Sequence, residues 1–201
     1  MTEPDVAVVV LAAGRGSRLV ANVPKPLLEL RGRPLVSWAL DAATASELHP
    51  VVLVVGYRAS AVTRAATEGV VVVRSRRWRG GISRSLRAAV EAMAPWARVG
   101  AVCVGLADQP LVGPDAYRRL AGAFHGGATL AVATYRGRRG NPVLVARPLW
   151  HEARRLTGDV GARALMDDHD VVEVDCTDTG DPSDVDTLED LREAERRLEA
   201  T

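Results

Sequence analysis

Short apolar runs alternate along this chain with stretches whose apolar residues recur every three or four positions. A short run rich in β-branched residues predicts a strand, and the spacing of three or four predicts a helix with one buried face. The predicted strands are residues 6–11, 51–55, 70–73, 99–106, 129–134, 142–145 and 171–174. The predicted helices are residues 35–45, 59–67, 82–93 and 115–124, followed by a last helix that carries Leu188, Leu191 and Leu198.

The predicted strands are apolar throughout instead of alternating with polar residues, which indicates that both faces of the sheet are covered. Strands that alternate with helices are joined by parallel crossovers. One connection, residues 135–142, joins two strands without a helix and predicts a late antiparallel hairpin. We therefore expect one α/β domain over residues 1–201, built as a three-layer, Rossmann-like open sheet, mostly parallel with one late antiparallel strand.

The composition narrows the class of protein. Hydrophobic residues make up 47% of the chain and charged residues 25%, which excludes a disordered protein. A formal net charge of +1 gives no overall attraction to nucleic acid or to a membrane, so neither is an expected partner. Cys103 and Cys176 have no metal-binding spacing and indicate reduced thiols in a cytoplasmic protein. The first ten residues lack a signal-peptide pattern, and no apolar run is long enough to span a membrane.

A glycine-containing loop follows the first predicted strand, at the edge of the sheet where ligands bind in open α/β folds. Its glycines allow a sharp turn whose backbone N–H groups can bind phosphates. Neither common phosphate motif is present, because Leu19 stands where a dinucleotide fingerprint has its third glycine, and Lys25 lies between two prolines instead of following a glycine. The candidate phosphate-binding residues are Ala12, Ala13, Gly14, Arg15, Gly16, Ser17 and Arg18.

Lys25 is the only lysine of the chain, because the other 25 of its 26 basic residues are arginine. Pro24 and Pro26 stiffen the backbone on either side of it. An ammonium on a flexible stem can follow a phosphate oxygen through a transfer reaction, whereas a planar guanidinium favours fixed bidentate pairing. Chance retention of one lysine is the alternative to this phosphate hypothesis.

An arginine-rich run at residues 74–86 leads into the predicted helix 82–93. Gly80 and Gly81 open the helix, and Ser83 or Ser85 could cap it or bond the edge of a base. RNA binding is the alternative for a basic stretch that contains tryptophan. Aromatic residues are only 4% of the chain and predict no stacking platform, which disfavours RNA.

Carboxylates stand at two further places where a ligand could meet the sheet edge. Asp108 follows the apolar strand 99–106, and residues 181–190 concentrate acid just before the last helix. Asp186 and Glu189 fit an N-terminal capping arrangement, which is one interpretation of that segment. Magnesium binding by Asp108 with Asp184 or Asp186 is the other, because Mg²⁺ takes one or two carboxylates together with phosphates and water.

With these residues assembled, the chain resembles the MobA-like nucleotidyltransferases, and within them the molybdenum cofactor cytidylyltransferases. The resemblance extends over nearly the whole length and rests on several motifs in order. They are L-A-A-G-x-G-S-R-L at residues 11–19, P-K-P-L at 24–27, V-V-G-Y-R at 54–58, G-x-x-x-S-L at 81–86, L-A-D-Q-P at 106–110, R-G-N-P-V-L-V at 139–145, G-D-V-G-A-R at 158–163 and D-V-D-T-L-E-D-L at 184–191.

The resemblance implies a fold of the nucleotide-diphospho-sugar transferase type and transfer of a nucleotidyl group from an NTP to a phosphate acceptor, with release of pyrophosphate. It implies that the glycine loop holds the triphosphate, with Arg18 on the outer phosphates and Lys25 at the α-phosphate. Gly81 and Ser85 match base-recognition positions, and Asp108 and Asp186 match Mg²⁺ ligands. Such transfer needs positioning and charge neutralisation more than a covalent nucleophile.

The choice of substrate rests on the resemblance alone. The sequence L-A-A-G in place of L-A-G-G favours CTP over GTP, and the implied acceptor is a phosphorylated small molecule of the molybdopterin type. Asn141 stands where relatives commonly have histidine, and Asn141, Asp159 and Arg163 are the candidate acceptor-binding residues. Two alternatives remain open: transfer to another phosphorylated acceptor such as a sugar phosphate, and a non-catalytic nucleotide-binding module that serves a molybdoenzyme or its chaperone.

Overall fold

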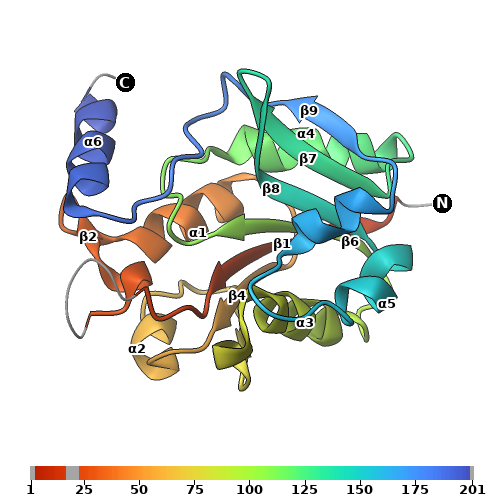
Figure 1. Ribbon diagram of the computed structural model, residues 1–201, viewed down its shortest axis with the longest axis horizontal. Helices are drawn as coiled ribbons and strands as arrows, with labels where there is room; N and C mark the ends of the chain where they lie inside the picture. The colour runs from red at the N-terminus through yellow and green to blue at the C-terminus, as the bar shows by residue number, and fades with distance from the viewer. Residues whose placement is uncertain (1–2, 17–22, 200–201) are drawn as a thin grey trace.

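The structure is a computed structural model that describes residues 3–16 and 23–199. Within these residues, the main sheet has seven strands in the order β5-β4-β1-β6-β8-β7-β9 (Figure 1). They are β1 (Asp5–Ala12), β4 (Val51–Val55), β5 (Val71–Arg74), β6 (Val99–Leu106), β7 (Leu130–Tyr135), β8 (Arg138–Ala146) and β9 (Val172–Asp175). The α-helices are α1 (Leu35–Ala45), α2 (Ala59–Thr63), α3 (Ile82–Met93), α4 (Pro114–His125), α5 (Trp150–Ala153) and α6 (Leu188–Glu199).

The direction of the strands confirms the expected open, mostly parallel sheet. β1 is parallel to both β4 and β6, β4 is parallel to β5, and β7 is parallel to β9. β8 is antiparallel to its two neighbours, β6 and β7. The turn between β7 and β8 is the connection without a helix, and it produces the one antiparallel strand of the main sheet.

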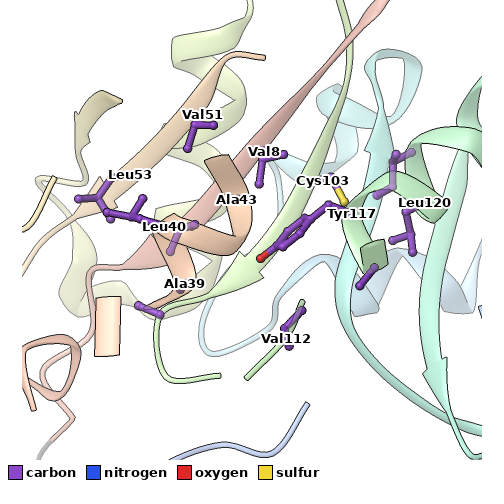
Figure 2. Close-up of a cluster of buried hydrophobic side chains, with 14 of the residues drawn as sticks. Val8, Ala39, Leu40, Ala43, Val51, Leu53, Cys103, Val112, Tyr117 and Leu120 are labelled. Carbon is purple, nitrogen blue, oxygen red and sulfur yellow. The ribbon is translucent and has the colours of Figure 1, made fainter. Parts of the chain in front are cut away.

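The central strands are apolar throughout because each face of the sheet is covered by helices, which gives three layers. Along β1, Val8 packs into the layer formed with α1, α2 and α4, while the next residue, Val9, packs into the layer formed with α3 and α5. Figure 2 shows the first layer, where the ring of Tyr117 from α4 lies near Val8 and Cys103 and α1 contributes Leu40. Successive residues of a strand point to opposite faces, so an uninterrupted apolar strand is what two covered faces require.

The two edge strands differ from the expectation that both faces are buried. Residues of β5 alternate between half-buried and exposed, and β9 is mostly exposed, with Val172 exposed on its surface. These strands end the sheet, so each has a neighbouring strand on one side only. The interpretation of continuous burial therefore holds for the inner strands and is wrong for β5 and β9.

Other differences lie outside the main sheet. The predicted helix 59–67 ends at Thr63, because residues 64–65 form a turn. Two short strands, β2 (Glu29–Leu30) and β3 (Arg33–Pro34), form a separate hairpin that the sequence pattern did not indicate. Figure 1 shows α6 beside β2, and a small apolar cluster joins the two elements, with Leu30 and Ala194 buried in it.

The capping interaction expected before α6 is displaced by one residue. Thr187 and Asp190, and not Asp186 and Glu189, form the pair: the Thr187 hydroxyl accepts a hydrogen bond from the Asp190 N–H at 3.1 Å, and the Asp190 carboxylate accepts one from the Thr187 N–H at 2.7 Å. This capping box satisfies N–H groups that have no partner within the helix. The Asp186 side chain is therefore available for another role. No helix in the described part of the chain is long and apolar enough to cross a bilayer.

Candidate functional site

A cavity of about 510 Å³ lies at the carboxyl ends of β1 and β6, the edge at which open α/β sheets bind ligands. Three groups of residues line it. The glycine loop after β1 forms one wall, Lys25 with Asp108 and Asp186 forms the second, and the start of α3 with the turn before it forms the third.

Most of the predicted phosphate-binding segment lines the cavity. Ala12, Ala13, Gly14, Arg15 and Gly16 all line the cavity. A Cβ built on Gly14 would meet no atom within 4 Å, so the backbone there is open to a ligand. Gly16 has a φ of +57° and packs against the Lys25 side chain, where any larger residue would clash. Ser17 and Arg18, the other two predicted members, lie outside the described residues.

Lys25 joins the two carboxylates that the sequence places far apart. Its Nζ donates to Asp108 Oδ2 at 2.5 Å and to Asp186 Oδ1 at 2.7 Å. The Lys25 side chain is only 12% exposed. Burial lowers the pKa of Lys25, but the charges and hydrogen bonds of the two aspartates outweigh burial, and the pKa is raised overall. The ammonium therefore stays charged across the neutral range.

The backbone explains why these three residues meet. Lys25 begins a short 3-10 helix, η1 (Lys25–Leu27), that follows Pro24 and continues into the buried Pro26. Asp108 follows the last residues of β6, where the Ala107 N–H donates to the Leu11 carbonyl at 3.1 Å. The Val185 N–H donates to the Asp108 carbonyl at 2.9 Å, and this bond brings the acidic segment before α6 to the end of β6.

The carboxylate oxygens of Asp108 and Asp186 suit a divalent cation that also binds the phosphate oxygens of a nucleotide. One oxygen of Asp108 and one of Asp186 converge on a single cationic atom, the Lys25 ammonium. No group of three or more histidine, cysteine or acidic side chains within residues 3–16 and 23–199 is arranged to hold a metal. Two carboxylates with phosphate oxygens and water are the ligands that Mg²⁺ prefers. Asp108 and Asp186 would hold such an ion.

Asp184, the other predicted metal ligand, has a different environment. It does not line the cavity, and its Oδ1 accepts a hydrogen bond from Gln109 Nε2 at 2.9 Å. Burial and the neighbouring Asp108 charge raise the pKa of Asp184. The structure thus separates the two late aspartates, with Asp186 facing Lys25 and Asp184 facing Gln109.

The third wall comes from the start of α3. Gly81 and Ser85, the predicted base-recognition residues, line the cavity together with Ile82. Gly81 has a φ of +94°, and a side chain there would collide with the backbone of Gly158. The Gly158 carbonyl accepts a hydrogen bond from the Ser83 N–H at 3.3 Å, so the turn at residue 158 closes the N-terminal end of α3.

The predicted acceptor residues are divided by the structure. Asp159 follows the Gly158 turn and lines the cavity, whereas Asn141 and Arg163 do not. Asn141 Nδ2 donates to Gln109 Oε1 at 3.1 Å, and Gln109 in turn donates to Asp184. Gln109 thus connects the late hairpin to the acidic segment, a role that sequence reasoning did not assign.

Sequence reasoning also missed an aromatic pair at the rim of the cavity. The rings of Tyr57 and Trp78 lie 5.5 Å apart, the guanidinium of Arg79 lies 4.7 Å from the Trp78 ring, and that of Arg15 lies 5.7 Å from the Tyr57 ring. The two rings are tilted by 57° to each other, so they form an aromatic contact and not a flat stacking platform. The two rings lie more than twenty residues apart in sequence and meet because Tyr57 follows β4 and Trp78 follows β5, which are neighbouring strands. The only available signal was that each ring stands beside arginine.

The tight fit at Gly81 leads to a stability prediction. We expect Gly81→Ala to lower the free energy of unfolding by more than Gly137→Ala, as measured by chemical denaturation. Both glycines have positive φ, so each alanine carries a backbone cost of about 1–3 kcal/mol, and Gly81, with φ +94° and ψ 177°, lies in a region that is essentially restricted to glycine. Only Gly81 would also collide with a neighbouring backbone, since a Cβ on Gly137 meets no atom within 4 Å. Equal losses in the two variants would contradict this packing.

The amino-acid sequence of the chain is similar to those of known proteins. Residues 8–174 match the family model of the MobA-like NTP transferase domain. Nicotine blue oxidoreductase of Paenarthrobacter nicotinovorans is 34% identical over 199 residues, which cover 94% of this chain and 95% of that protein. The bifunctional protein GlmU of Pelobacter propionicus is 34% identical over 153 residues, which cover 76% of this chain. This chain spans only 33% of the length of that GlmU protein.

Solved structures agree in fold. The crystal structure of Rv0371c from Mycobacterium tuberculosis superimposes with a TM-score of 0.82 and 32% sequence identity, covering 97% of this chain and 100% of that one. The manganese complex of Rv0371c superimposes with a TM-score of 0.79 and 33% identity over the same shares. From the family match over most of its length, the chain belongs to the MobA-like NTP transferase domain family.

Proposed function

We propose that this protein is a Mg²⁺-dependent nucleotidyltransferase that transfers CMP from CTP to the phosphate of a molybdopterin-type acceptor. Pyrophosphate is the second product. The observation that carries the proposal is the convergence of Lys25, Asp108 and Asp186 beside the glycine loop. One mobile cation, two metal-binding oxygens and an open backbone turn are the groups that a triphosphate requires.

The residues divide the work of transfer between binding and charge neutralisation. Backbone N–H groups of the glycine loop bind the triphosphate, and the Lys25 ammonium moves from the carboxylates to an oxygen of the α-phosphate. An acceptor phosphate oxygen then attacks the α-phosphorus, and the bond to the bridging oxygen of pyrophosphate breaks. When bound by Asp108 and Asp186, Mg²⁺ supplies positive charge that offsets the charge developing on the phosphates.

The cavity wall formed by the start of α3 would bind the nucleobase, beside the triphosphate. Gly81 offers close backbone approach, Ser85 offers a hydroxyl, and Asp159 is a carboxylate on the same cavity. A carboxylate accepts a hydrogen bond from the exocyclic amine of cytosine or of guanine, and no such amine is present in uracil. These groups therefore disfavour UTP, and the sequence resemblance favours CTP over GTP.

The acceptor is the second substrate of the proposed transfer. We place the phosphorylated acceptor on the side of Lys25 and Asp186, where the Asp186 side chain is about half exposed. Molybdopterin is favoured by the resemblance in sequence, and a sugar phosphate is the alternative acceptor, because it offers the same attacking phosphate oxygen. A molybdoenzyme or its chaperone is the class of protein partner that would receive a molybdopterin product.

An acceptor-by-nucleotide matrix tests the proposal. Purified protein with Mg²⁺ is given CTP or GTP together with molybdopterin, molybdenum cofactor or a sugar phosphate, and pyrophosphate release is measured. We expect release with CTP and the pterin acceptors, and none when the acceptor or the metal is omitted. Release only with a sugar phosphate would reassign the acceptor, whereas nucleotide binding without release in every combination would indicate a non-catalytic module.

A redox activity is the second candidate, because the relative named as an oxidoreductase matches this chain over 94% of its length. The open backbone of the glycine loop could also bind the pyrophosphate of a dinucleotide, although Leu19 departs from the dinucleotide fingerprint. The two candidates differ in their products. Oxidation of NADH or NADPH by an electron-accepting dye, without any pyrophosphate release in the matrix, would favour the redox activity.

A further inference from the structure

A second cavity, of about 340 Å³, lies beside the segment that joins β5 to α3, the yellow part of the ribbon in Figure 1. It shares no lining residue with the cavity at the carboxyl ends of β1 and β6, which we call the nucleotide cavity. Its lining is almost entirely charged and includes Glu91. Five arginines, which we call the arginine cluster, line it: Arg74, Arg76, Arg77, Arg84 and Arg87.

The charge of this cavity is unbalanced. Glu91 is already paired with Arg87, whose Nε lies 2.7 Å from Glu91 Oε1. Within the residues that the structure describes, none of the other four arginines forms an ion pair with a carboxylate. The chain as a whole carries only +1, so the excess of positive charge at this cavity is a local feature and not a property of the whole chain. Like charges held together repel, and a bound anion would relieve that repulsion.

The fold holds the two sides of the cavity together. The buried Ser75 hydroxyl donates to the Arg84 carbonyl at 3.2 Å, and the Ser75 N–H donates to the Val55 carbonyl at 2.8 Å. The Arg84 side chain packs against Gly80, where a Cβ would lie 3.0 Å from Arg84 Cγ. Arg84 and Arg87 are three residues apart on α3 and therefore share one face of the helix.

We propose that the arginine cluster binds a diphosphate-type anion at a site separate from the nucleotide cavity. Guanidinium groups bind phosphate oxygens in pairs, with strong charge-assisted hydrogen bonds. The volume falls at the small end of ligand pockets, which suits a compact anion better than a nucleic acid strand. Free pyrophosphate and the diphosphate group of a nucleotide present the same chemistry. Arg84 and Ser85 are consecutive on α3, so the same helical turn borders both cavities.

Isothermal titration calorimetry of the whole protein without divalent metal tests this proposal. The probes are inorganic pyrophosphate and ADP, with sodium chloride at matched ionic strength as the control. The variants Arg84→Gln and Arg76→Gln are compared with Arg138→Gln. Arg138 is an exposed arginine on β8, four strands along the sheet from β5. Any binding in the nucleotide cavity is common to all three variants, so differences among them report the cluster whether or not the proposed activity is correct.

We expect the dissociation constant of pyrophosphate at the cluster to rise about tenfold in each cluster variant, and to stay unchanged in Arg138→Gln, because each loses one charged donor. Equal affinities for pyrophosphate and ADP assign the site to the diphosphate group alone, and tighter ADP binding assigns it to an esterified diphosphate. Unchanged affinity in both cluster variants would overturn the proposal. A heat of binding reproduced by chloride, or binding of single-stranded RNA alone, would overturn it as well.

Discussion

Replacing Lys25 with alanine is expected to lower the rate of pyrophosphate release by about 10²–10³-fold, the loss typical of one preorganised charge donor. The side chain is held between Asp108 and Asp186 beside the glycine loop, so its charge is already positioned where phosphates would lie. The measurement is the steady-state rate with CTP, Mg²⁺ and acceptor. A circular dichroism spectrum and melting curve confirm that the variant is folded.

Lys25→Arg is the matched variant, because it keeps the charge and changes its shape. We expect it to be impaired too, since a planar guanidinium that pairs with one carboxylate cannot follow a phosphate oxygen as an ammonium does. A full rate in Lys25→Arg would show that charge alone suffices and would contradict our explanation for the single lysine.

The direction of the Lys25 pKa adds a pH dependence. The pKa is raised in the fold, so the stabilisation by the two aspartates is fully present below the ordinary lysine value of 10.5 and is lost only as pH rises through the folded value. The rate is therefore not expected to fall through loss of this proton between neutral pH and the ordinary lysine pKa.

The second large effect is expected at Asp108. Asp108→Asn keeps the size of the side chain but removes the charge that would hold Mg²⁺, and we expect the rate to fall on the order of 10³-fold, since a metal contributes several kcal/mol of charge stabilisation. The Mg²⁺ concentration for half-maximal rate is expected to rise as well. Both quantities come from one titration of rate against metal.

Asp184→Asn provides the control for Asp108→Asn. Its amide oxygen can still accept the hydrogen bond from Gln109, and the side chain does not line the cavity. We expect a rate and a metal requirement close to those of the wild type. A large loss of rate in Asp184→Asn together with a raised metal requirement would mean that the wrong late aspartate has been placed on the metal.

Much of the fold follows from local pattern. The apolar runs predict the bounds of β4 and β6, and the three-to-four spacing predicts those of α1 and α3. The pattern is visible because the buried faces of these elements consist of apolar residues. The β2–β3 hairpin was not predictable in this way, since strands of two residues are too short to show a period. The cap of α6 was ambiguous: Asp186 with Glu189 and Thr187 with Asp190 both fit a capping pattern, and the choice depends on where the helix begins.

The sequence predicted which residues belong to the site better than it predicted which of those residues contact one another. Lys25, Asp108 and the late aspartates each stand out by position, but the sequence alone did not distinguish Asp184 from Asp186. The Val185–Asp108 backbone bond settles their orientation, and such a long-range contact leaves no local trace in the sequence. Asn141 and Arg163 were selected by resemblance, and their distance from the cavity wall follows from packing that no short motif encodes.

The central claim is that Lys25 leaves the two carboxylates for a phosphate when nucleotide and metal bind. The direct measurement is a crystal structure with a non-hydrolysable CTP analogue and Mn²⁺, with the metal located by its anomalous scattering. We expect one metal bridging Asp108, Asp186 and phosphate oxygens, with the Lys25 ammonium on an α-phosphate oxygen. A triphosphate bound away from the glycine loop, or Lys25 still held between both carboxylates with nucleotide in place, would contradict it.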